Sequence, residues 1–194
     1  MPSLPGPARL RGASIGIVCA ATSSPETVNK RILTAWLNDA HAMEARSLTV
    51  LRRAAADSRQ RVEVRVRLES HVRETVQHAQ RLQQALDVLG SSPAPLERHA
   101  DPVMVLASDI TARVFSDPLM GKVIAAVAAK QFEVAAYTAL IAAAEHAGEA
   151  EVARLCRLNR GEDEEMAEWL EAQIWIVLGE KVAGTFPAKV PATF

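Results

Sequence analysis

Apolar residues recur at steps of three and four along four long stretches of the chain. This spacing is typical of helices that bury one face and expose the other. The predicted helices cover about 25–57, 60–89, 117–148 and 149–179. Only 4% of the residues are aromatic, and alanine dominates long stretches, which suits closely packed helices better than a sheet. The pattern therefore predicts an all-α protein.

The ends of these stretches carry residues that favour starting or stopping a helix. Ser24 offers a capping hydroxyl, and Pro25 follows it at the first helical position. Asp117 and Pro118 repeat this arrangement at the start of the third helix. Gly90 and the proline that follows it three residues later end the second helix.

The lengths of the connections predict the topology. The first two helices are joined tightly, as are the last two, so each pair must run antiparallel. A connection over about 90–117 joins the pairs, and residues 101–102 (Asp-Pro) would start a short extra helix within it. Two antiparallel hairpins joined by one long crossover are the topology of a ferritin-like four-helix bundle.

We expect this bundle to occupy residues 24–182 as a single domain. Residues 1–23 are rich in proline and are predicted to be a disordered leader, and 183–194 an irregular tail. An apolar run at 13–18 follows basic residues but is short for a secretory signal. The sequence leaves open whether the leader is a targeting segment.

Charge and cysteine usage narrow the setting in which the protein works. The 22 basic and 23 acidic residues nearly cancel, which gives no reason to expect nucleic acid or an anionic membrane as a partner. No segment approaches the roughly 20 apolar residues that a membrane span requires. Cys19 and Cys156 lie in settings too different for a disulfide framework. These features predict a cytoplasmic protein.

One glutamate interrupts the apolar stripe of each predicted helix. The four acids are Glu44, Glu74, Glu133 and Glu162. His71 and His78 lie one turn to either side of Glu74, on the same face of the second helix. A carboxylate in a core costs free energy unless a proton, a cation or a metal ion neutralises it.

The four acids are also predicted to lie at one height in the bundle. Each is separated by about thirteen to fifteen residues from its nearer tight turn, near 59 or near 148, which is roughly 20 Å along a helix. Carboxylates with one or two imidazoles suit iron or manganese, and would also take zinc. The match to di-iron bundles is partial, because only the second helix supplies histidines and Glu165 or Met166 stands where another would be expected.

Several of these residues also have an explanation that needs no metal. His71, Glu74 and His78 have several arginines nearby, which is typical of a solvated helix face. Glu162 begins an acidic run that can simply face water. Tyr137 is better explained as a core tyrosine with a paired hydroxyl than as a redox group.

The residues themselves resemble a known family. The stretch 37–44 (LNDAHAME) resembles the first helix of the YciF/YciE-type ferritin-like proteins, and 71–82 (HVRETVQHAQRL) is similar to the second-helix motif. The stretch 132–137 (FEVAAY) is similar to the third-helix signature, and 152–170 resembles the fourth helix. The resemblance covers about 30–180, and its second and third motifs are the more specific.

This resemblance implies a ferritin-like bundle, often a homodimer, with a di-metal centre and a link to stress responses. The implied metal ligands are Glu44, Glu74, Glu133 and Glu162, with His78 or His71 as the imidazole. The chain departs from the family at 130–131, where Lys-Gln stands in place of Glu-His. The Lys130 ammonium can reach the same layer and replace the charge of a metal ion.

Two hypotheses follow from these observations. The first is a metal-dependent protein, with two iron or manganese ions, that handles iron or activates oxygen or peroxide. The second is a metal-free helical stress or scaffold protein that kept the fold and lost the centre, with Lys130 paired to Glu133 or Glu44. The sequence assigns no substrate, electron donor or reaction.

Overall fold

The computed structural model describes residues 25–95 and 116–182. Within these residues the chain forms four helices, which are α1 (Pro25–Asp57), α2 (Val62–Val88), α4 (Pro118–His146) and α5 (Ala150–Val182). The predicted bounds agree with these to within about three residues. The predicted leader, the tail and the short helix expected near 101 lie outside the described residues.

The helix ends follow the local chemistry of the sequence. The Asp117 carboxylate accepts hydrogen bonds from the backbone N–H groups of Leu119 (2.9 Å) and Met120 (3.0 Å), which caps α4. Gly90 after α2 and Gly148 after α4 both have positive φ angles, of 70° and 75°. A glycine adopts this left-handed conformation without steric cost, so both helices end there.

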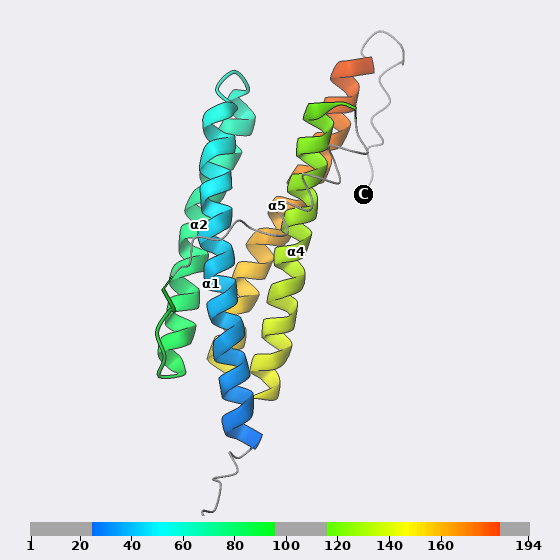
Figure 1. Ribbon diagram of the computed structural model, residues 1–194. Helices are drawn as coiled ribbons and strands as arrows, with labels where there is room; N and C mark the ends of the chain where they lie inside the picture. Colours follow the sequence, from blue (N-terminus) through cyan, green and yellow to red (C-terminus); the bar gives the residue numbers. More distant parts are fainter. Residues whose placement is uncertain (1–24, 96–115, 183–194) are drawn as a thin grey trace, which may run out of the picture.

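The two hairpins pack side by side with their tight turns at opposite ends of the molecule (Figure 1). Helix α1 packs against α2 and α4, and α5 packs against α4 and α2. The predicted arrangement of two antiparallel helical pairs is therefore confirmed. Arg61, in the connection between α1 and α2, forms an ion pair with Glu180 near the end of α5, which also joins the two hairpins.

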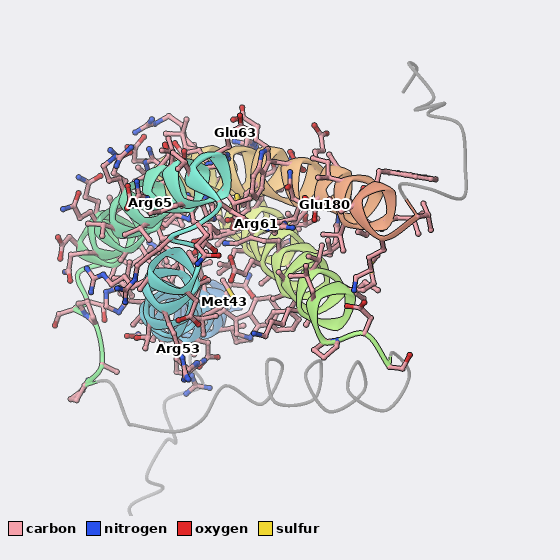
Figure 2. All side chains as sticks on the ribbon, turned by 90° about the horizontal axis from the view of Figure 1, so that it is seen from above. Met43, Arg53, Arg61, Glu63, Arg65 and Glu180 are labelled. Atoms are coloured by element: carbon pink, nitrogen blue, oxygen red, sulfur yellow. The ribbon has the colours of Figure 1, made fainter. Side chains whose placement is uncertain are left out.

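The core consists of two apolar clusters separated by a polar layer. The larger cluster lies around Leu37, Leu86 and Tyr137, and the smaller one around Leu51 and Met166. A view along the bundle shows side chains from the helices, Met43 of α1 among them, pointing into the space between the helices (Figure 2). Buried polar residues occupy the stretch of each helix that lies between the two clusters.

Helix α4 corrects one expectation from the sequence. By length and composition it is apolar enough to cross a membrane. The expectation that no segment approaches the roughly 20 apolar residues of a membrane span was therefore wrong. In the structure α4 packs against α1 and α5, and its charged residues Lys130 and Glu133 are buried. Its apolar surface is therefore explained in part by packing in the bundle.

Truncation of a core leucine tests this packing. Leu82 is 1% exposed and lies in the larger cluster, whereas Val66 on the same helix is 54% exposed. We expect Leu82→Ala to lower the free energy of unfolding by about 2–5 kcal/mol, because it leaves a cavity. Val66→Ala should change it by no more than about 0.5 kcal/mol. Urea denaturation followed by circular dichroism measures both, and equal effects would contradict the packing described.

Candidate metal centre

Eight polar or charged side chains form a layer between the two apolar clusters, and each is at most 5% exposed. They come from all four helices. The members of this buried polar layer are Glu44, His71, Thr75, His78, Lys130, Glu133, Asn159 and Asp163. So many polar groups in a core require partners, and the partners define the chemistry of the site.

The Asp163 carboxylate lies at the centre of this layer. Its Oδ1 atom accepts a hydrogen bond of 2.9 Å from the Lys130 ammonium. The same oxygen lies 3.5 Å from His71 Nε2 and 3.9 Å from His78 Nδ1. Residues from α2, α4 and α5 therefore meet at one carboxylate oxygen.

Glu44 is the residue that α1 contributes to the buried polar layer. Its Oε1 atom accepts a hydrogen bond of 2.5 Å from the Tyr137 hydroxyl and lies 3.3 Å from His78 Nδ1. The Asn159 amide in turn donates to the Tyr137 oxygen (3.0 Å) and to the His78 backbone carbonyl (3.2 Å). These bonds fix the tyrosine hydroxyl and direct it at the glutamate, as expected for a core tyrosine whose hydroxyl is paired.

Each histidine is held from outside by a glutamate that an arginine anchors. His78 Nε2 lies 2.8 Å from Glu162 Oε2, and Arg81 donates to both oxygens of that carboxylate at 2.9 Å. His71 Nδ1 lies 2.6 Å from Glu74 Oε2, and Arg67 contacts that carboxylate at 3.2 Å. In both cases one ring nitrogen faces the surface and the other faces the layer. Carboxylates that bind the outer nitrogen of a histidine commonly orient metal ligands in this way.

Lys130 supplies a positive charge inside the layer. It is 3% exposed, and its ammonium donates to Glu133 as well as to Asp163. Burial by itself would lower the pKa of Lys130, but the nearby carboxylates, Glu133 first, raise it above its usual range. The lysine therefore stays charged at neutral pH.

The other ionisable groups respond to the same burial and charges. Burial acts to lower the pKa of His78, but the hydrogen bond with Glu162 and the nearby carboxylates of Glu44 and Asp163 raise it to about 9. Burial and the charge of Lys130 lower the pKa of His71 to about 2, so that imidazole is neutral. Burial acts to raise the pKa of Glu133, and the charge of Lys130 opposes this effect.

Several inward-facing atoms of the layer have no hydrogen-bond partner among the residues that the structure describes. They are Glu44 Oε2, His71 Nε2, Thr75 Oγ1, His78 Nδ1 and Asp163 Oδ2. A neutral His71 that donates its Nδ1 hydrogen to Glu74 has a lone pair on Nε2, which faces Asp163. Two hydrogen-bond acceptors, the Nε2 nitrogen and the carboxylate oxygen, therefore face each other. A cation between such acceptors would satisfy them.

Three of these side chains form a potential ligand set. Donor atoms of Glu44, His78 and Asp163 all lie within 4.8 Å of one another, and all three residues are buried. Two carboxylates and one imidazole suit iron, manganese or zinc, and binding would release the proton from His78 Nδ1, since a ligating histidine is neutral. The residues present therefore fit one such ion, with His71 Nε2 next to the set.

The structure brings four of the six residues predicted as ligands into the layer. Glu44, His71, His78 and Glu133 are 0–5% exposed. Glu74 and Glu162 instead keep 26% and 28% of their side chains exposed and contact the histidines from outside. The expected convergence of all four glutamates in one buried layer is therefore wrong for these two.

Asp163 is the acid that the sequence interpretation missed. It follows Glu162 directly, and one residue step turns a side chain by about 100° around a helix. A stripe through Glu162 also includes Leu158, one turn before it, which is 44% exposed, whereas the buried stripe passes through Asn159. The spacing of Cys156, Asn159, Asp163 and Met166 carried the correct signal, but two polar residues hid it.

Four antiparallel helices around a buried layer of carboxylates and imidazoles define a ferritin-like four-helix bundle. The comparison with solved structures supports this class. The bacterioferritin of Desulfovibrio desulfuricans, whose structure is described as containing a diiron site, aligns with a TM-score of 0.63. The alignment covers 89% of this chain and 99% of the bacterioferritin at 15% identity, which establishes the fold alone.

The chain belongs to the family described as a domain of unknown function (DUF892), whose sequence profile matches residues 29–181. A protein from Xanthomonas campestris is 29% identical, with a TM-score of 0.62 over 79% of this chain and 94% of that one. YcfI from Rhodopseudomonas palustris is 26% identical, with a TM-score of 0.64 over 77% and 96%. These matches confirm the resemblance to the YciF-type ferritin-like proteins.

The tyrosine–glutamate contact can be tested separately. We expect Tyr137→Phe to lower the free energy of unfolding by about 1.5–3 kcal/mol, because the buried Glu44 loses a charged hydrogen bond. The control is Thr138→Val, since the exposed Thr138 hydroxyl bonds only to its own helix in the described contacts. Thermal and urea unfolding measure both variants, and a Tyr137→Phe effect no larger than the control would contradict this role.

Proposed function

We propose that this protein is a ferritin-like carboxylate protein that binds a redox-active metal ion, iron or manganese, in the buried polar layer. The ligands in this proposal are Glu44, His78 and Asp163. The observation that carries it is the group of inward-facing oxygen and nitrogen atoms that could bind a metal ion and have no hydrogen-bond partner among the described residues. Such atoms are rare in a protein core unless an ion or a water molecule satisfies them.

The surrounding residues hold these ligands in place. Glu162, fixed by Arg81, keeps the His78 ring turned so that Nδ1 faces Glu44 and Asp163. The hydroxyl of Tyr137 fixes one oxygen of Glu44 and leaves the other available. In this proposal Glu162 orients an imidazole and is not itself a ligand, and Glu74 has the same role toward His71.

A bound iron or manganese ion would supply one-electron redox chemistry, as needed to oxidise iron or to activate oxygen or peroxide. The protein would contribute a binding layer that the two apolar clusters separate from solvent. The di-metal centre expected from the sequence, its place in a stress response, the homodimer and the cytoplasmic location stay predictions. The same holds for the expectation that neither nucleic acid nor a membrane is a partner.

A specific observation favours a second candidate function. The Lys130 ammonium already pairs with Glu133 and Asp163, and His78 lies between Glu44 and Glu162. Such a layer can balance its charges without metal, as a helical stress or scaffold protein would require. This candidate leaves the unpaired donor atoms of Glu44 and Asp163 without an explanation.

Metal analysis distinguishes the two candidates. We expect purified protein, loaded with ferrous iron or manganese under argon and desalted, to retain at least one ion per chain. The melting temperature should rise with added metal and fall with a chelator, because a ligand that binds only the folded state stabilises it. If the protein retains no metal and its melting temperature changes with neither added metal nor chelator, the metal-free candidate is supported.

A ligand substitution localises the ion. Glu44→Gln keeps an oxygen for the Tyr137 hydroxyl but removes the charge, so we expect metal affinity to fall by at least the roughly 10–100-fold typical of lost outer-shell partners. The matched control is Asp39→Asn, an exposed acid on the same helix. Isothermal titration calorimetry measures both affinities. Equal affinities for the two variants would place the ion elsewhere.

A further inference from the structure

We propose that the buried polar layer holds one metal ion and one fixed ammonium, with Lys130 standing where a second metal ion would bind. This inference rests on the proposed metal-binding function and specifies it further. It differs from the di-metal centre that the sequence predicts, because the residues present fit one ion and one lysine.

The layer divides into two parts that share Asp163. One part is the ligand set of Glu44, His78 and Asp163, whose donor atoms lie within 4.8 Å of one another. The other is Lys130, which donates to Glu133 and, at 2.9 Å, to Asp163 Oδ1. Asp163 thus contacts the ammonium with one oxygen, while its other oxygen has no partner among the described residues. A carboxylate shared between two cations is the arrangement that a bridging ligand has in a two-metal site.

Lys130 occupies one oxygen of the Glu133 carboxylate. The ammonium is 3% exposed and is held by two carboxylates from two helices, so it does not swing out to solvent without breaking both contacts. Glu133, which the sequence suggested as a ligand, is instead the partner of this lysine. The inward nitrogens of His71 and His78 both lie on the side of Asp163, and neither is in a described contact with Glu133.

Electrostatics then opposes a second ion. A divalent cation next to a buried ammonium is repelled, and the repulsion is strong where solvent screening is weak. The same ammonium makes the two ends of the layer unequal, because one contains an exchangeable cation and the other a covalently attached one. The consequence would be a site with room for one exchangeable metal ion beside a fixed positive charge.

Substitution of Lys130 tests this inference through stoichiometry. We expect the unmodified protein to bind one manganese ion per chain, and Lys130→Glu to bind two, since it replaces the ammonium with a carboxylate beside Glu133. Plasma mass spectrometry after desalting gives the count. Electron paramagnetic resonance should change from the signal of isolated manganese to that of a spin-coupled pair. The matched control is Lys122→Glu, an exposed lysine on the same helix, which should stay at one ion.

A second variant decides the matter if Lys130→Glu does not fold. Lys130→Met removes the charge and keeps an unbranched side chain, so the single ion should bind about tenfold more tightly or better, because a nearby like charge is gone. Calorimetric titration with manganese measures this change. Unchanged affinity in Lys130→Met would overturn the inference, as would a folded Lys130→Glu that still binds one ion.

The unmodified protein separates the possible failures. Two ions per chain, with a spin-coupled signal, would overturn the inference while leaving the proposed metal-binding function intact. No ion in the unmodified protein, in Lys130→Met or in Lys130→Glu would overturn the proposed function itself. One ion in the unmodified protein and two in Lys130→Glu would support both.

Discussion

The contact between Asp163 and Lys130 is the interaction on which the rest of the buried layer depends. Both groups are almost fully removed from solvent, and each would be costly to bury alone. Together they anchor a layer in which Glu133, His71 and His78 are all placed by reference to the same charges. The physical constraint is neutrality: buried acids persist only where positive charge of some kind meets them.

This constraint also connects the two helical hairpins. Glu44 and the two histidines come from the first hairpin, whereas Lys130 and Asp163 come from the second. Every contact between these two groups therefore crosses the interface between the hairpins. Apolar packing above and below the layer tolerates small shifts along a helix, but a hydrogen-bonded layer fixes one register. The arginines that hold Glu74 and Glu162 strengthen this layer from the partly exposed side.

The comparison with bacterioferritin shows why a shared fold does not settle the chemistry. The backbone arrangement is common to both proteins, but identity over the aligned chain is 15%. Whether a bundle of this class contains two ions, one ion or none depends on individual residues at the layer. In this chain those residues include a lysine, and its charge counts in the same balance as that of a metal ion.

The sequence by itself determined the four helices, their ends, their pairing and the height of the polar layer. These features follow from the spacing of apolar residues, from glycine and proline, and from the lengths of the connections, all of which act locally. Tertiary structure decided which acids enter the layer. Helix α5 has exposed apolar residues, Leu158 among them, beside its buried stripe, so its rotation about its own axis was ambiguous. Only packing against α2 and α4 turned Asp163 inward and left Glu162 to hold a histidine from outside, because a step of one residue moves a side chain by about 100°.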